Sequence, residues 1–291
     1  MTFGKKLLAA TLGTMMMASP ALSADTQLSA LFMSQAAYSE QDIEQMTAAF
    51  EQANPGVDVK MEFVPYEALH DKIVLSHNAS DGYDVVLFDV IWPAEFAQFG
   101  LLEDVSDKID DSTKSEILDG AWTTVEYDGK YYGMPWIVDT KYLFYNEKML
   151  SEAGLSKAPE TWGELIEQAK TIKEKGIVEY PLVWSWSQSE AVICDYTTLL
   201  SAMGGDFLDA DKKPAFQKGG GLKALEYMVD SIKLGLTNPN SREYSEEDVR
   251  RTFSSGKAAY ALNWTYMYNL ANDPKESSVA GQVRIAPALG V

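Results

Sequence analysis

The stretch from residue 128 to 165 constrains the fold more than any other part of the chain. It opens with Asp128-Gly129, a pair typical of a tight hairpin turn because glycine tolerates a positive φ. The run WIVDTKYLFYN follows, and its aromatic and β-branched residues favour a largely buried strand. A short helix is expected next, and Thr161 with Glu164 predicts the capping box of another helix. A hairpin, a buried strand and two helices in succession indicate an α/β protein.

The N-terminal third alternates strand-like and helical segments. Strands are predicted over residues 28–33, 57–63 and 83–89, and helices over 40–52 and 66–77. This order predicts a parallel sheet covered by helices. Ligands of such sheets bind beyond the carboxyl ends of the strands, which here are followed by the loops 35–38 and 88–92.

Two motifs carry a resemblance to a known family. The first is GKYYGMP at residues 129–135, followed by a strand ending in Tyr-Asn and by AGLSKAPETWGEL at 153–165; the second is FSSGKAAYALNW at 253–264. Together they resemble the extracellular solute-binding proteins of ABC importers, in carbohydrate-binding family 1, which includes maltose-binding protein. The resemblance covers nearly all of the sequence after the signal. It departs at Tyr260, where Met is usual, and at Asn263, where Gly or Pro is common, which leaves the backbone of this loop open.

The resemblance implies a type II periplasmic-binding-protein fold, in which two lobes, each a mixed sheet covered by helices, are joined by hinge crossings. We expect the N-terminal lobe at residues 24–138 and 264–291 and the C-terminal lobe at 139–263. A strand at 283–287 is expected to return to the first lobe. Family members normally continue with further helices, so the N-terminal lobe is expected to be incomplete and the chain truncated at its C-terminal end.

The N-terminus has the pattern of a secretory signal peptide. Lys5 and Lys6 precede the apolar run 7–17, and small residues follow up to Ala24. Cleavage after Ser23 suits the small-residue positions better than cleavage after Ala24, so residues 1–23 are assigned to the signal. The run is too short for a lasting membrane anchor, which needs about 20 apolar residues. The protein is therefore expected in a bacterial periplasm, without stable membrane insertion.

Charge and cysteine content exclude several classes. The chain has 24 basic and 43 acidic residues; removing the signal leaves 22 basic ones, a net charge of −21. Nucleic acid and anionic membranes are poor partners for that charge. Cys194 is the only cysteine, so an intramolecular disulfide is impossible and stability must come from the core.

Candidate ligand contacts combine loop position with residue type. Asp89 follows the third predicted strand, and the resemblance implies that an acidic residue there accepts sugar hydroxyls, as it implies a cleft role for Asp139 and Trp264. Trp186 with Glu190 suits pyranose recognition, because an indole stacks on the apolar sugar face while a carboxylate binds hydroxyls. The alternative is that one of the two indoles, Trp184 or Trp186, lies in the core and the other caps a lobe. The full set of expected contacts is Gln35, Tyr38, Asp89, Trp92, Trp136, Asp139, Trp186, Glu190, Trp264 and Tyr266.

The favoured function is capture of a sugar or sugar alcohol in an interlobe cleft and its delivery to an ABC permease by a monomeric protein. Catalysis, a cofactor and a metal are not expected; His70 and His77 are too far apart to chelate one ion. A polyamine-binding protein of the same architecture is the first alternative, since aromatic and acidic residues can also cage an ammonium group. An exported carbohydrate-active enzyme is the second, and it would need two carboxylates across one cleft.

Overall fold

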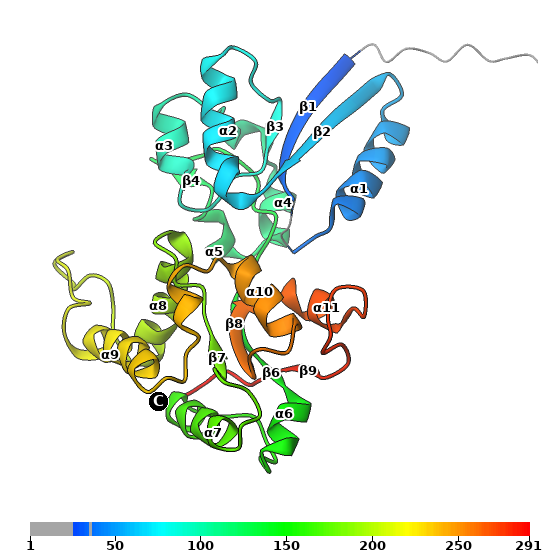
Figure 1. The fold of residues 1–291 in the computed structure, drawn as a ribbon. Coiled ribbons are helices and arrows are strands. Elements are labelled where there is room, and N and C mark those ends of the chain that lie inside the picture. The colour runs from blue at the N-terminus through cyan, green and yellow to red at the C-terminus, as the bar shows by residue number, and fades with distance from the viewer. Residues whose placement is uncertain (1–25, 35–36) are drawn as a thin grey trace, which may run out of the picture. The chain divides into compact units, whose positions relative to one another are not determined.

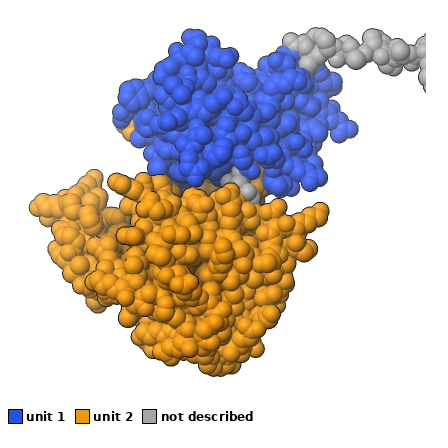
Figure 2. Space-filling model, in the orientation of Figure 1, with its two compact units in different colours: residues 1–35, 39–101 blue, residues 36–38, 102–291 orange. Residues whose placement is uncertain are grey.

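The computed structural model describes residues 26–34 and 37–291. The chain forms two compact units, which Figure 2 colours separately: residues 1–35 with 39–101, and residues 36–38 with 102–291. The predicted signal peptide and Gln35 lie outside the described residues. Among the residues that are described, no helix combines the length and apolar composition needed to cross a membrane.

The first unit is a parallel sheet with helices in the connections (Figure 1). Its elements are β1 (Thr26–Met33), α1 (Glu40–Ala53), β2 (Val57–Val64), α2 (Tyr66–Asn78), β3 (Val85–Val86) and α3 (Pro93–Gln98). The strand order is β2-β1-β3, with Ala30 opposite Met61 on one side and Val85 on the other. The parallel sheet predicted from the βαβ pattern is confirmed, although β3 is shorter than the predicted strand.

The second unit contains the rest of the elements. They are η1 (Ser106–Lys108), α4 (Asp111–Glu116), α5 (Asp119–Trp122), β4 (Glu126–Tyr127), β5 (Lys130–Tyr131), β6 (Lys141–Asn146), α6 (Glu147–Glu152), α7 (Trp162–Glu174), β7 (Leu182–Val183), α8 (Glu190–Ala202), α9 (Gly219–Lys233), η2 (Pro239–Arg242), α10 (Glu246–Ser254), β8 (Tyr260–Trp264), α11 (Met267–Asn272) and β9 (Val283–Ile285). Four of these strands form one mixed sheet in the order β7-β8-β6-β9.

Alternate residues of this sheet enter two separate cores. On β6, Leu143 packs into a cluster with Leu165 and Leu199 of α7 and α8, whereas its neighbour Phe144 packs into a second cluster with Phe253 of α10. In β7, likewise, Leu182 packs into the first cluster and the next residue, Val183, into the second. Because successive side chains of a strand point to opposite faces, the sheet is covered by helices on both sides.

The motif at residues 128–165 folds largely as predicted. Asp128 and Gly129 have φ of 51° and 74°, and they join β4 to β5 in the expected hairpin. The hydroxyl of Thr161 accepts a hydrogen bond from the Glu164 backbone N–H, as an N-cap should. The reciprocal half of the predicted capping box is absent at this helix start, because the Glu164 carboxylate accepts from the N–H of Glu160 instead.

The placement of the last strand corrects the expected domain division. β9 was expected to return to the first lobe, but Phe144 of β6 faces Ile285 in an antiparallel pair, so β9 completes the sheet of the second unit. Residues 264–291 therefore belong to the second unit, as do residues 102–138. The remaining lobe boundaries stay predictions.

Candidate ligand-binding site

Polar and aromatic side chains gather at one edge of the sheet in the second unit. β7 and β8 run parallel and both end at this edge, while β6 runs antiparallel to β8 and begins there. In register, Lys141 at the start of β6 lies opposite Trp264 at the end of β8. The edge thus has the geometry at which α/β sheets bind ligands, beyond the carboxyl ends of parallel strands.

The centre of this edge is a buried cluster around Lys141. The Lys141 ammonium group donates to Asp195 Oδ1 of α8 at 2.7 Å, to Glu246 Oε1 of α10 at 3.0 Å and to Ser185 Oγ at 3.1 Å. The side chain of Lys141 is 2% exposed, that of Asp195 is 0% exposed, and that of Glu246 is 19% exposed. One cation therefore serves two carboxylates in an enclosed setting, with a net charge of −1.

Burial and the neighbouring charges shift the pKa values of Lys141 and Asp195 in opposite directions. Burial lowers the pKa of Lys141, but the Asp195 and Glu246 carboxylates outweigh it, and the pKa is raised above its ordinary value. Burial raises the pKa of Asp195 to about 6, although the Lys141 ammonium pulls it down. Lys141 therefore stays charged, and Asp195 is ionised only above about pH 6.

Trp264 is held against this cluster. The Lys141 Nζ lies 5.1 Å from the centroid of the Trp264 ring, a cation–π distance, and the indole Nε1–H donates to Glu246 Oε1 at 3.4 Å. Asn263 fixes the backbone: its Nδ2 donates to the Glu246 carbonyl at 2.8 Å, and its Oδ1 accepts from the Trp264 N–H at 2.8 Å. The sequence left the shape of this loop open at Asn263, and these two bonds supply the physical reason for an Asn there.

Two further expected contacts lie at the same edge. Asp139 accepts from the backbone N–H groups of Thr140 and Thr265, at 2.7 and 3.4 Å, so it ties the start of β6 to the chain that leaves β8. The Tyr266 hydroxyl donates to Glu247 Oε2 at 3.2 Å. Burial and the Glu247 carboxylate raise the pKa of this hydroxyl. The structure brings Asp139, Trp264 and Tyr266 together; their contact with a ligand stays a prediction.

Trp186 and Glu190 have local partners of their own. Trp184 and Trp186 stack with centroids 5.4 Å apart, and both are buried, at 1% and 6% exposure. Sequence reasoning expected only one of this pair to be in the core. Glu190 accepts from the Cys194 thiol at 2.6 Å, and burial, followed by this carboxylate, raises the pKa of that thiol. The ligand roles of Trp186 and Glu190 are untested.

In the first unit, Asp89 follows β3 as expected. It is partly buried, and its Oδ1 accepts from the Ile91 N–H at 3.3 Å, which is the turn-forming alternative to a ligand role. Trp92 is 7% exposed and packs on Tyr66 and His70, with ring centroids 5.8 and 5.1 Å away. These contacts make Trp92 a core residue of its unit, and its predicted ligand contact stays untested.

Tyr38 and Trp136 pair with each other in the second unit. Their rings stack with centroids 5.1 Å apart and planes inclined by 17°, and Trp136 is 44% exposed. An exposed stacked pair of this kind offers an apolar face to a sugar ring.

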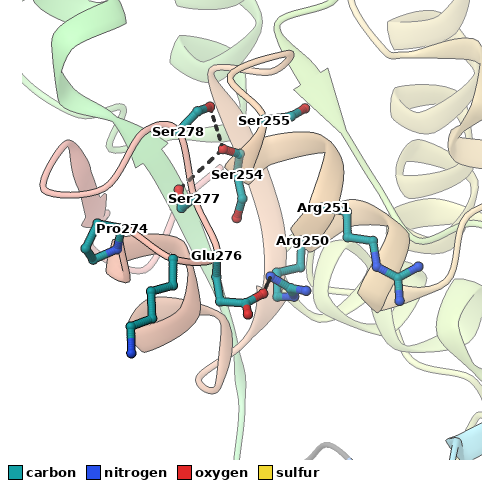
Figure 3. Close-up of a pocket in the computed structure, with 9 residues that line it drawn as sticks. Arg250, Arg251, Ser254, Ser255, Pro274, Glu276, Ser277 and Ser278 are labelled. Atoms are coloured by element: carbon teal, nitrogen blue, oxygen red, sulfur yellow. Dashed lines mark hydrogen bonds and ion pairs between the residues drawn. The ribbon is translucent and has the colours of Figure 1, made fainter.

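Two other features of the described residues bear on the kind of site: the arrangement of metal-ligating side chains and a polar surface hollow. Within residues 26–34 and 37–291, no group of three His, Cys, Asp or Glu side chains is arranged to hold a metal ion. A surface hollow at the C-terminal end of α10 is lined by polar and charged side chains, and its described lining contains no aromatic residue. Figure 3 shows Arg250 in this hollow paired with Glu276, and Ser277 and Ser278 donating to the Ser254 carbonyl.

Sequence reasoning missed three members of the buried cluster. They are Lys141, Asp195 and Glu246. Lys141 directly precedes the apolar segment YLFYN, and Asp195 is a single charge inside AVIC-YTTLL. Because an isolated charge is rarely buried without a partner, that pattern could have predicted a buried ion pair.

The fold and this strand edge define an α/β solute-binding protein of the type II periplasmic-binding class. The family model described as bacterial extracellular solute-binding protein matches residues 36–290, and the chain belongs to that family. A maltose-bound MalE3 of T. maritima is 33% identical, with a TM-score of 0.81, over 91% of this chain and 68% of that one. A solute-binding protein of Agrobacterium radiobacter K84 in complex with ribitol is 25% identical, with a TM-score of 0.76, over 92% and 68%.

Curated relatives are longer than this chain. A binding protein of Brucella abortus (strain 2308) is 27% identical over 226 residues, which are 78% of this chain and 55% of the relative. The chain thus spans about half the length of the curated relatives it matches.

Proposed function

We propose that this protein is the periplasmic solute-binding component of an ABC importer, that it binds a sugar or a sugar alcohol, and that it delivers this solute to a membrane permease. It acts as a monomer and leaves the solute chemically unchanged. The observation that carries the proposal is the pairing of the partly exposed Trp264 ring with the Glu246 carboxylate at the strand edge.

The residue chemistry of this edge suits a neutral hydroxylated ligand. An indole face stacks on the C–H groups of a sugar ring or of an extended polyol, and a carboxylate accepts hydroxyl hydrogens. The relatives complexed with maltose and with ribitol support a ligand of this class. In the first unit Asp89 stays our predicted acceptor of a ligand hydroxyl.

The two alternative functions fit the cluster less well. A carboxylate pair for glycoside hydrolysis requires both groups to reach the substrate, and Asp195 is fully buried beside Lys141. A polyamine would meet a carboxylate, that of Glu246, whose charge is already partly neutralised by the Lys141 ammonium group.

A thermal-shift screen tests the proposal. The protein is heated with maltose, tagatose, mannitol, ribitol, putrescine, spermidine and amino acids, because a ligand that binds only the folded state stabilises it, by about 2.7 kcal/mol at 100 times its Kd. We expect a raised Tm with a sugar or polyol, and recovery of that compound unchanged. A shift with putrescine or spermidine alone would instead establish polyamine binding.

Two alanine variants test whether the assigned residues bind the ligand. Trp264→Ala and Asp89→Ala should each weaken binding by about 1 to 3 kcal/mol, through a lost stacking face and a lost hydroxyl acceptor. Trp122→Phe is the control, because Trp122 is buried and packs on Tyr131, with ring centroids 5.2 Å apart. Unchanged affinity in both folded alanine variants would contradict the assigned site.

A further inference from the structure

The ammonium group of Lys141 has no hydrogen left for a ligand. A lysine has three donors, and those of Lys141 point to Asp195, Glu246 and Ser185 at 2.7, 3.0 and 3.1 Å. Its side chain is 2% exposed. Although it lies at the strand edge, Lys141 acts on a ligand only through its neighbours.

Those neighbours are the two groups that we assign to the ligand. Lys141 is in register with Trp264, and its Nζ lies 5.1 Å from the ring centroid, so it supports the ring of the residue opposite it in the sheet. The two hydrogen bonds of the Glu246 carboxylate, from Lys141 Nζ and from Trp264 Nε1, are both accepted by Oε1. The other carboxylate oxygen, Oε2, accepts neither of these two bonds and is the atom that we assign to a ligand hydroxyl.

The lysine is itself held rigidly. Asp195 Oδ2 accepts from the Ser185 backbone N–H at 3.2 Å and from its hydroxyl at 3.3 Å, so the anion that binds Lys141 is locked between α8 and the end of β7. Because every group in this chain of contacts has a fixed partner, the cluster can define one orientation of Trp264 and Glu246 before a ligand arrives.

We propose that Lys141 is a positioning residue of the binding site, which presets the Trp264 ring as a stacking platform and aims Glu246 Oε2 at a ligand hydroxyl. This inference rests on the proposed function. It also bears on specificity: because Lys141 partly neutralises Glu246, this carboxylate attracts a second ammonium less strongly than an unpaired carboxylate would, which lowers the advantage of a polyamine over a sugar or polyol.

The test measures affinity in three variants and one matched control. Isothermal titration uses maltose, tagatose, mannitol and ribitol as probes, and putrescine for comparison, with the wild type, Lys141→Met, Glu246→Gln and the double variant. Lys173→Met is the control, because Lys173 Nζ donates to the carbonyls of Glu179 and Gly235 at 3.1 and 2.7 Å and lies 5.2 Å from the Tyr180 ring, away from the strand edge.

We expect Lys141→Met to weaken binding at least tenfold and Lys173→Met to leave it unchanged. Adding Lys141→Met to Glu246→Gln should weaken binding less than adding Lys141→Met to the wild type, because part of the effect of the lysine passes through Glu246. Lys141→Met should also narrow the preference for polyol over putrescine. Wild-type affinity in Lys141→Met, or an equal loss in Lys173→Met, would overturn the positioning role while leaving the function intact; a wild type that binds none of the probes overturns the proposed function and this inference with it.

A second readout needs no ligand. The indole N–H resonance of Trp264, assigned with Trp264→Phe in ¹⁵N-labelled protein, reports the ring's contact with the ammonium and with Glu246. It should shift in Lys141→Met and stay in place in Lys173→Met. An unmoved resonance in folded Lys141→Met would overturn the inference by itself.

Discussion

Removing the charge of Lys141 should destabilise the second unit in a manner that depends on pH. Lys141→Met keeps the length and the apolar stem of the side chain but leaves Asp195, which is fully buried, and Glu246 without their cation. Loss of one partner from a buried ion pair costs about 3–5 kcal/mol, because the remaining charge is uncompensated. We expect a loss of this size in the free energy of unfolding at pH 7.5, measured by urea denaturation followed by tryptophan fluorescence.

The pH dependence follows from Asp195. Burial raises its pKa in the folded protein to about 6, whereas the unfolded value is 3.8. A carboxyl with a raised folded pKa contributes stability below its unfolded pKa, and this contribution is lost as the pH rises through the folded pKa. Without the lysine the folded pKa rises further, so the difference between wild type and Lys141→Met should be smaller at pH 5 than at pH 7.5.

A double variant distinguishes the stability lost through the uncompensated charge from the stability lost through altered packing. Lys141→Met/Asp195→Asn removes the uncompensated buried charge and should recover at least half of the loss at pH 7.5. A loss below about 1 kcal/mol in Lys141→Met, or a loss that is the same at pH 5 and pH 7.5, would refute the reasoning that the cluster is a compact buried charge network.

Four other variants test the fold. Gly221→Ala should lower Tm, because a Cβ at residue 221 would collide with the backbone carbonyl oxygen of Phe216. At Gly163 the nearest atom would lie 3.7 Å from an added Cβ, so Gly163→Ala should raise the free energy of unfolding by about 0.4–1 kcal/mol. Equal changes of Tm in the two variants would contradict the close packing at Gly221. Tyr260→Phe should cost about 1–3 kcal/mol in urea denaturation, since it leaves the buried acceptor of Gln168 unpaired, and a neutral result would show that the bond is not formed. Hydrogen bonds from Ser106 and from Lys130 lower the pKa of Asp104 to about 2. The Asp104 carboxylate should therefore stabilise the folded protein above about pH 4, and this contribution should be lost as the pH falls through about 2. The Tm of Asp104→Asn, followed against pH, should lack this loss, and identical pH profiles of Tm for wild type and variant would contradict the prediction.

Local patterns of the sequence predicted most of the elements but not their full extent. The hairpin at Asp128-Gly129 and the N-cap hydrogen bond of Thr161 depend on neighbouring residues, and both form as predicted. The strand predicted from Trp136 is paired only from Lys141 onward. Its partners, β8 and β9, are more than 100 residues away, and the length of a strand depends on its partners as much as on its own residues.

The candidate site was predicted in part. Trp264 and Asp139 were selected, and they do lie at the strand edge of the second unit. Lys141 and Glu246 were not selected, because their significance comes from a contact across 105 positions of sequence that no local pattern specifies. For Trp184 and Trp186, composition could not distinguish a core indole from an exposed one, since both lie between strand and helix and only packing decides their burial.

The most direct test of the central claim is an isothermal titration of the protein with mannitol, ribitol, maltose and putrescine, followed by chemical analysis of the recovered compound. We expect saturable binding of one sugar or polyol at one site per chain, with the compound recovered intact and with binding at least about fivefold weaker in Trp264→Ala. Turnover of the compound, or binding of putrescine alone, would contradict it.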